Sequence, residues 1–128
     1  MLSYRHAFHA GNFADVLKHL VLVQILSYLT QKDKSFCYIE THAGAGRYPL
    51  DSAFAQKNRE FENGIAKLWH RDGLPDSVAR YRQLIKTFNT ANALVCYPGS
   101  PLIAARLMRP KDRLLLYELH SSYYPLLV

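Results

Sequence analysis

The sequence predicts an α/β fold of the doubly wound type, on three observations. Residues 36–41 form a short, almost continuously apolar segment, typical of a strand that is covered on both faces of a parallel sheet. A loop with glycines at positions 44 and 46 follows directly, and glycine allows a tight turn and the close approach of a ligand. A second apolar segment, 113–118, ends in Glu118. We therefore expect parallel strands whose carboxyl ends carry a binding site.

Composition bounds the size and the partners of the protein. A chain of 128 residues, 49% of them hydrophobic, has room for one domain with a real core. The 16 Lys and Arg exceed the 10 Asp and Glu, which gives a net charge of +6. This excess favours a polyanionic partner, although spare surface lysines would produce the same value.

Cysteine content and segment hydropathy indicate the compartment. Cys37 and Cys96 each lie in an apolar run, so we expect core thiols in a reducing compartment rather than a disulfide or a zinc site. The first residues are polar and basic with no apolar stretch behind them, which argues against a signal peptide. Uninterrupted apolar runs such as 20–23 are far too short to span a membrane. We expect a cytoplasmic protein without membrane contacts.

Residues 1–50 are predicted to hold a lead, a helix, the first strand and the glycine loop. The lead, 1–11, is polar and aromatic and contains histidines. Asn12 suits a helix N-cap, and Asp15 would then occupy the third helical position, where a negative charge suits the helix dipole. The apolar residues within 16–29 fill more than one helical face, so we expect this helix to be largely buried.

Residues 51–92 are predicted to form a helical hairpin. Apolar residues repeat at helical spacing over 61–69 and again over 78–88, and the turn between them would place Asp76 as an N-cap. We expect the inner face of the hairpin to pack and the outer face to be solvated. Alternatively, the outer face contacts RNA phosphates through its basic residues. These are Lys57, Arg59, Arg80, Arg82 and Lys86.

Residues 93–128 are predicted to continue the sheet. Residues 94–97 indicate a short strand or an extended segment. Ser100 followed by Pro101 is a strong helix start, with Ser100 as N-cap and Pro101 at the first helical position. Pro110 ends that helix, the second buried strand follows, and a further helix begins near the last residues.

The glycine loop and Glu118 together predict a nucleoside site. In doubly wound folds the loop passes near the ligand, and an acid at the tip of the next strand binds the ribose hydroxyls. Gly46 and Glu118 are 72 positions apart, against roughly 20 in the dinucleotide pattern. Without the 42 residues of 51–92 the separation is 30, so the hairpin is best explained as an insertion between neighbouring strands. The alternative for Glu118 is an ordinary surface acid.

Six histidines do not predict a metal centre. His6 and His9 are separated by two residues, but no cysteine or acidic pair lies nearby at ligand spacing. His19 should lie in the buried first helix as a hydrogen-bonded core imidazole. His42 lies inside the proposed ligand loop, where a binding role is better supported. Nothing in the sequence resembles a Ser-His-Asp arrangement.

Four separated motifs resemble the RlmJ type of ribosomal RNA methyltransferase. They are Tyr4-Arg5-His6-x-Phe8-His9-Ala10-Gly11-Asn12 with Asp15-Val16-Leu17-Lys18-His19, Thr41-His42-Ala43-Gly44-Ala45-Gly46-Arg47-Tyr48, Tyr97-Pro98-Gly99-Ser100-Pro101, and Glu118-Leu119-His120. The resemblance covers essentially the whole chain. It implies a Rossmann-like methyltransferase sheet with a helical insert. It also implies transfer of a methyl group from S-adenosylmethionine to the exocyclic N6 amine of an adenine in 23S ribosomal RNA.

The resemblance also implies a role for particular residues. The residues that would contact S-adenosylmethionine are His19, His42, Ser100 and Glu118. Tyr4, His6 and Lys18 would serve the RNA side, with the Tyr4 ring available for stacking on an unstacked adenine and Lys18 supplying charge. Other basic residues would add salt-dependent affinity for RNA phosphates. These are Arg5, Arg106, Arg109, Lys111 and Arg113. The implied reaction requires no metal.

The chain departs from the family at the catalytic motif. The family places Asp-Pro-Pro-Tyr at the end of a later strand, and these 128 residues contain no Asp-Pro-Pro and no strands after Glu118. We therefore expect a truncated fold, the N-terminal portion of a longer monomeric enzyme whose catalytic acid lies beyond residue 128. The piece itself should be inactive, and it should fold poorly alone because its strands keep unpaired edges.

Two other functions stay open. One is a non-catalytic RNA- or nucleotide-binding module that keeps the cofactor loop without the chemistry. The other is a nicotinamide-dependent oxidoreductase, because Gly-x-Gly with a strand-end acid also suits a dinucleotide. The missing third glycine and the basic lead count against the oxidoreductase. Competition between S-adenosylhomocysteine and NAD would separate these functions.

Overall fold

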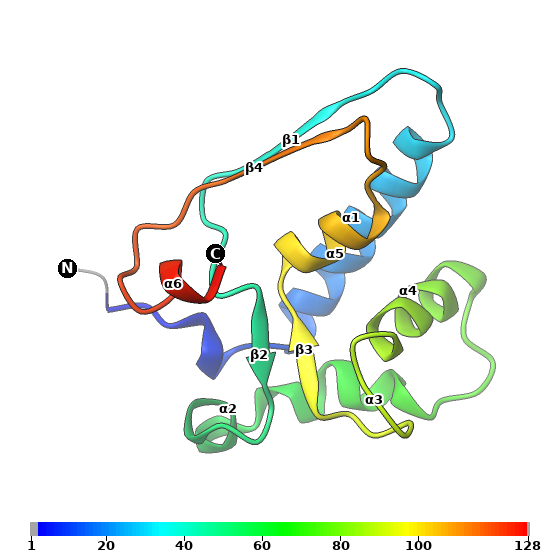
Figure 1. Cartoon of the computed structure of the whole chain (residues 1–128). Helices are drawn as coiled ribbons and strands as arrows, with labels where there is room; N and C mark the ends of the chain where they lie inside the picture. The colour runs from blue at the N-terminus through cyan, green and yellow to red at the C-terminus, as the bar shows by residue number, and fades with distance from the viewer. Residues whose placement is uncertain (1–2, 128) are drawn as a thin grey trace.

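The protein is a mixed α/β structure in which helices pack beside two short pairs of strands (Figure 1). The computed structural model describes residues 3–127, so Met1 and Leu2 of the predicted lead and Val128 of the last segment lie outside it. The elements are η1 (His6–Phe8), α1 (Phe13–Thr30), β1 (Cys37–Glu40), β2 (Arg47–Pro49), α2 (Ala53–Asn58), η2 (Glu60–Asn63), α3 (Ile65–Trp69), α4 (Asp76–Lys86), β3 (Cys96–Pro98), α5 (Ser100–Leu107), β4 (Arg113–Leu116) and α6 (Tyr124–Leu127).

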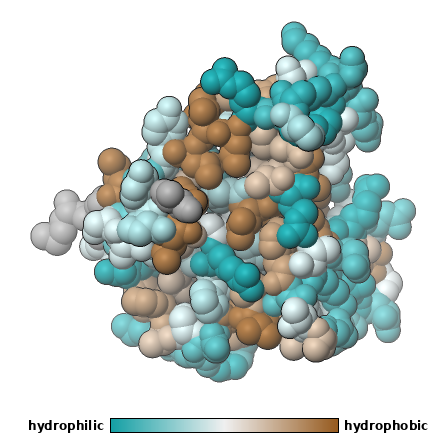
Figure 2. Space-filling view, in the orientation of Figure 1, coloured by the Kyte–Doolittle hydropathy of each residue, from teal (hydrophilic) through white to brown (hydrophobic). Residues whose placement is uncertain are grey.

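Strands β1 and β4 form the expected parallel pair. Cys37 lies opposite Arg113 and Glu40 lies opposite Leu116, so the two carboxyl ends meet at one edge of the pair. Helices α1 and α5 both lie on one side of this pair (Figure 1). The prediction that β1 is covered on both faces is wrong, because Cys37 and Ile39 are exposed. The described residues supply cover for one face only, and Figure 2 shows apolar surface over β1 and β4.

Strands β2 and β3 form an antiparallel pair that the sequence did not predict in full. Tyr48 lies opposite Tyr97 in this pair. The extended segment at 94–97 was expected, whereas β2 was not. Each strand has only three residues, which is too short to show an alternating pattern. Pro49 within β2 further weakens the strand signal, because proline removes a backbone donor.

The segment 51–92 is helical but is more than a simple hairpin. The first helical run is interrupted at Gly64, between η2 and α3. A side chain at this position would meet the backbone of Gly11, so the close approach requires glycine. The Ile65 amide donates to the Gly11 carbonyl at 2.9 Å, which ties the segment to the N-terminal lead. Helix α4 begins at Asp76 itself, with Pro75 as N-cap, so the predicted cap is displaced by one residue.

Helix α1 begins as predicted and is less buried than predicted. The Asn12 side chain accepts a hydrogen bond from the Asp15 amide at 2.9 Å, as an N-cap should. Only four of its residues are buried, so the prediction of a largely buried helix is wrong. Large apolar side chains of α1 are exposed instead. They are Phe13, Leu17, Val21, Ile25 and Tyr28, which we call the open face of α1.

By length and composition, α1 is the one helix within residues 3–127 that could cross a membrane, with a mean hydropathy of 1.3. Core helices of soluble proteins pass the same test. Counting uninterrupted apolar residues therefore understated how apolar this helix is.

Helix α5 and the two cysteines need small corrections. The N-cap of α5 is Gly99, so Ser100 is the first helical residue and its hydroxyl is free for another contact. Cys96 is buried as expected. Cys37 is exposed, so the prediction of two core thiols holds for only one of them. Apolar residues of α1, the 51–92 segment, β3 and α5 share one core.

Candidate functional site

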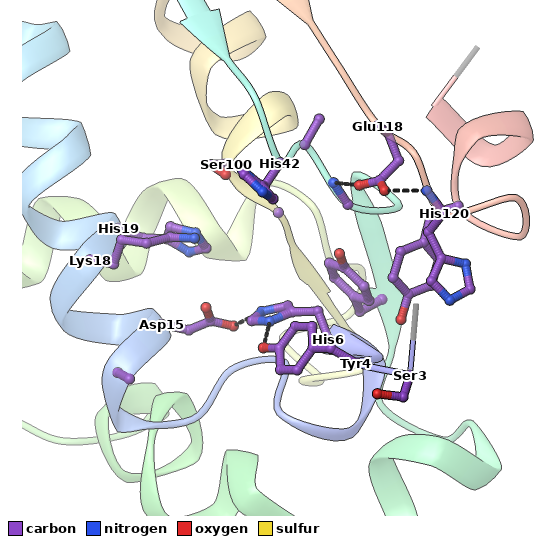
Figure 3. Close-up of a pocket in the computed structure, with 16 residues that line it drawn as sticks. Ser3, Tyr4, His6, Asp15, Lys18, His19, His42, Ser100, Glu118 and His120 are labelled. Atoms are coloured by element: carbon purple, nitrogen blue, oxygen red, sulfur yellow. Dashed lines mark hydrogen bonds and ion pairs between the residues drawn. The ribbon is translucent and has the colours of Figure 1, made fainter. Parts of the chain in front are cut away.

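One cavity of about 540 Å³ collects the predicted site residues (Figure 3). Its walls come from the N-terminal lead, α1, the glycine loop, the start of α5 and the segment after β4. All seven predicted site residues line it, and these are Tyr4, His6, Lys18, His19, His42, Ser100 and Glu118. The volume lies within the usual range of small-molecule sites, roughly 300–1,000 Å³. The structure thus brings these residues together, and their individual roles stay predictions.

Glu118 is held against the glycine loop by backbone groups. The Gly44 amide donates to one carboxylate oxygen at 2.6 Å, and the His120 amide donates to the other at 2.7 Å. The parallel pairing continues to this point, since the Ala43 amide donates to the Tyr117 carbonyl at 3.0 Å. Each carboxylate oxygen can accept more than one hydrogen bond, so Glu118 keeps acceptor capacity for a ligand.

Ser100 is buried at the start of α5 and points to the end of β1. Its hydroxyl donates to the Glu40 carboxylate, which also accepts from the Tyr38 hydroxyl at 2.9 Å. The side chain therefore links α5 to β1. The first amides of a helix have no partner within it, so this end of α5 can still offer N–H donors to a polar group.

His19 is buried on the inner side of α1, with 1% of its surface exposed. Its Nδ1 lies 2.8 Å from the Tyr97 hydroxyl, so the prediction of a hydrogen-bonded buried imidazole is confirmed. Its Nε2 is buried without a hydrogen-bond partner among residues 3–127. Burial lowers the pKa of His19 to about 4, although the Asp15 carboxylate opposes the shift. The imidazole is therefore neutral near pH 7.

Asp15 is a site residue that the sequence did not reveal. It is 3% exposed, and its carboxylate lies 2.7 Å from His6 Nε2 and accepts the Gly11 amide at 2.9 Å. His6 Nδ1 lies 2.8 Å from the hydroxyl of Tyr4, so the three side chains form a chain (Figure 3). Burial alone would raise the pKa of Asp15, but the hydrogen bond and charge of His6 hold it below the ordinary value. In the sequence, the only signal was that Asp15 precedes His19 by four residues, a spacing that puts both side chains on the same face of a helix.

Two exposed residues and a stacked aromatic pair also line the cavity. Lys18 and His42 are exposed, with His42 Nδ1 2.9 Å from the Thr41 hydroxyl. His120 and Tyr123, which the sequence did not single out, stack with ring centroids 4.7 Å apart. The Tyr123 hydroxyl accepts the amide of Ala7, which joins the lead to the segment after β4.

No group of three or more His, Cys, Asp or Glu side chains suited to a metal ion occurs within residues 3–127. The polar groups of the cavity are carboxylates, imidazoles, hydroxyls and backbone amides. Such a set recognises a polar organic ligand through hydrogen bonds.

Comparison with known proteins gives a consistent family. A family model described as "Ribosomal RNA large subunit methyltransferase D, RlmJ" matches residues 33–128. Proteins named "Ribosomal RNA large subunit methyltransferase J" are similar to this chain. The Escherichia coli (strain K12) protein is 55% identical over 127 residues, covering 99% of this chain and 45% of its own length. The Haemophilus influenzae protein is 54% identical over 128 residues, covering 99% and 46%.

A solved structure agrees with the sequence relatives. The crystal structure of a Legionella pneumophila protein superposes with a TM-score of 0.86 and 46% identity, covering 93% of this chain and 43% of that one. The chain thus spans less than half the length of the relatives it matches. With the family model and both relatives in agreement, the chain belongs to the RlmJ family of ribosomal RNA large subunit methyltransferases.

Proposed function

We propose that this chain is the cofactor-binding portion of an S-adenosylmethionine-dependent methyltransferase acting on an adenine N6 amine of 23S ribosomal RNA. Its relatives carry the name of a ribosomal RNA methyltransferase. In this proposal β1 and β4 are the first strands of a Rossmann-like sheet that later strands complete, and the enzyme works in the cytoplasm. The observation that carries the proposal is the Glu118 carboxylate fixed against the Gly44 amide in the lining of the cavity.

The cavity fits the cofactor chemically. A nucleoside presents vicinal ribose hydroxyls, and Glu118 keeps acceptor capacity on both oxygens after binding two amides. The unpartnered Nε2 of His19 offers a further polar contact. The amides at the start of α5, beside Ser100, suit an anionic or polar group, and His42 would contact the ligand at the rim. When bound, S-adenosylmethionine supplies an activated methyl group.

The open side of the cavity fits the RNA. The Tyr4 ring is exposed and held by His6, so it can stack on an adenine that has left its helix. Lys18, which lines the same cavity, is exposed and can contact phosphate. The net charge of +6 is consistent with an RNA partner.

Catalysis in the proposed enzyme is mainly positioning of the target amine. The residues that line the cavity hold the nucleoside end of the cofactor and the approaching base. The sequence contains no Asp-Pro-Pro, so the group that would orient the amine is not supplied by these 128 residues. We therefore expect the chain to bind cofactor without transferring the methyl group.

Isothermal titration with S-adenosylhomocysteine tests the proposed cofactor site. Glu118→Gln removes the charge that would bind the ribose, and we expect affinity to fall roughly 10- to 100-fold. Asp72→Asn, an exposed acid outside the cavity, is the matched control and should leave affinity unchanged. Equal affinity in Glu118→Gln and the parent chain would contradict the proposal, and displacement by NAD at similar concentration would favour an oxidoreductase.

A non-catalytic RNA- or nucleotide-binding module is the second candidate, favoured by the absence of Asp-Pro-Pro. Labelled S-adenosylmethionine and 23S ribosomal RNA incubated with the chain distinguish the cases. Transfer of label to RNA would contradict our expectation that the chain alone is inactive. RNA binding without transfer, followed by transfer when the rest of the family domain is present, would support the methyltransferase.

A further inference from the structure

We propose that Tyr97 and Tyr81 are positioning residues that fix His19 with its proton on Nε2, so that it offers a hydrogen-bond donor to the ligand. The inference rests on the proposed function for the identity of that ligand, whereas the state of His19 can be measured without it. It assigns the 51–92 segment a part in the site, through Tyr81.

The three side chains come from three different elements and meet in the core. His19 belongs to α1, Tyr97 to β3 and Tyr81 to α4. All three are buried, both tyrosines completely. The two tyrosine hydroxyls lie 2.6 Å apart, and the Tyr97 hydroxyl lies 2.8 Å from His19 Nδ1. The Tyr97 and His19 rings are also nearly parallel, at 16° with centroids 5.5 Å apart, which fixes the plane of the imidazole.

Proton counting and the position of the cavity together favour one direction for this chain of hydrogen bonds. If Tyr81 donates to Tyr97, and Tyr97 donates to His19 Nδ1, every hydroxyl proton has an acceptor. In the opposite direction Nδ1 donates to Tyr97 and Tyr97 donates to Tyr81, which leaves the Tyr81 proton buried with no acceptor among residues 3–127. Buried donors without partners are rare because they cost free energy. The first direction also leaves one buried donor unpaired, the Nε2–H of His19, but His19 lines the cavity and Tyr81 does not. Only in the first direction can a ligand pair the remaining donor, so we infer that direction, and it requires an unprotonated Nδ1.

A neutral imidazole with an unprotonated Nδ1 carries its proton on Nε2. Burial lowers the pKa of His19 to about 4, so the ring is neutral at physiological pH. Burial is the largest cause of this pKa shift. Of the charged groups that face the ring, Asp15 has the largest effect and raises the pKa, whereas Lys18 and His6 act in the same direction as burial.

The Nε2–H is then left without a partner on a side chain that lines the site. Nε2 is buried and unpartnered, while His19 lines the cavity and its ring extends toward it from α1 (Figure 3). A ligand oxygen that accepts this hydrogen bond would satisfy a donor that the free protein leaves unpaired. The site thus selects a ligand with an acceptor, such as a carboxylate or hydroxyl oxygen, at this position.

Long-range proton–nitrogen NMR spectra of the histidine-labelled chain measure the state of His19 without ligand. We expect Nε2 to be protonated and Nδ1 to appear as an unprotonated nitrogen that accepts a hydrogen bond. A protonated Nδ1 in the parent chain would overturn the inference. This measurement needs no substitution, so it does not depend on any variant being folded.

Two variants and a control test the role of each tyrosine. In Tyr97→Phe the Nδ1 resonance should move, because the nitrogen loses its donor, and affinity for S-adenosylhomocysteine should fall roughly 3- to 10-fold. In Tyr81→Phe nothing donates to Tyr97, so its hydroxyl can donate to Nδ1 or accept from it, and both ring-nitrogen resonances should move toward the average of the two tautomers. Unchanged resonances in Tyr81→Phe would overturn the role of Tyr81. Tyr28→Phe, an exposed tyrosine on α1, should change neither the resonances nor the affinity.

The outcomes separate this inference from the proposed function. An unchanged Nδ1 resonance in Tyr97→Phe overturns the inference, whether or not the ligand binds. A parent chain with the expected resonances that fails to bind S-adenosylhomocysteine contradicts the proposed function and leaves the positioning of His19 standing.

Discussion

Replacing Leu17 and Leu26 by alanine, one at a time, tests whether the open face of α1 is free in this chain. Leu17 is 63% exposed and Leu26 is 2% exposed, although both lie on the same helix. Full burial of a leucine side chain contributes about 2 kcal/mol, so the buried third of Leu17 contributes about 0.7 kcal/mol. Leu26→Ala also leaves a cavity, and such changes cost about 2–5 kcal/mol. We expect Leu26→Ala to be several times more destabilising.

Urea unfolding followed by far-ultraviolet circular dichroism measures both changes on one chain. If the chain begins to unfold at very low urea, trimethylamine N-oxide can raise the urea concentration at the unfolding midpoint, because this osmolyte strengthens the burial of apolar surface. The identical chemical change makes Leu26→Ala the reference for Leu17→Ala. If Leu17→Ala lowered the free energy of unfolding as much as Leu26→Ala does, the reasoning would be refuted. An effect of Leu17→Ala that grows with protein concentration would show that another molecule covers the open face.

Three further predictions concern charge. The free energy of unfolding should fall by roughly 3 kcal/mol as pH decreases from about 6.5 to about 4. The reason is that the pKa of His19 is lowered to about 4 in the folded state, so the unfolded chain takes up the proton first. His19→Asn should reduce this pH dependence of the free energy of unfolding in urea titrations at several pH values. The Arg109 guanidinium holds the pKa of Asp112 well below its ordinary value, so stability present above pH 4 is lost at lower pH, and Asp112→Asn should abolish that loss in acid titrations. Lys18→Ala should lower the salt dependence of single-stranded RNA binding by about 0.7 in logarithmic slope, measured by fluorescence anisotropy, while exposed Lys34→Ala, outside the cavity, should lower it less.

The site was largely predictable from the sequence because its parts lie at the ends of recognisable strands. The carboxyl ends of parallel neighbours meet, so a glycine loop after β1 and Glu118 after β4 had to come together once the strands paired. The histidines and Ser100 were assigned through the family resemblance. Asp15 was not found, because a carboxylate in the first turn of a helix is explained equally well by the helix dipole.

Burial was predicted less well than position. An apolar pattern shows which residues favour burial, and it does not show what covers them. Helix α1 is apolar on more than one side, and α5 and the 51–92 segment cover only the side that carries His19 and Leu26. The pair β2 and β3 escaped prediction for another reason, because three-residue strands give no periodicity and pair through contacts distant in sequence.

The same imbalance leads us to expect low stability for the isolated chain. Both sheets within residues 3–127 have only two strands, and such pairs are marginally stable unless a third strand or a helix supports them. The open face of α1 and the exposed side of β1 keep apolar surface in water. We expect a broad thermal transition and weak near-ultraviolet dichroism. A sharp cooperative transition with strong near-ultraviolet dichroism would contradict this expectation.

Because His19, Tyr97 and Tyr81 share one core, S-adenosylhomocysteine at 100 times its dissociation constant should add about 2.7 kcal/mol to the free energy of unfolding. That gain would show that the cavity forms even where the outer surface lacks cover.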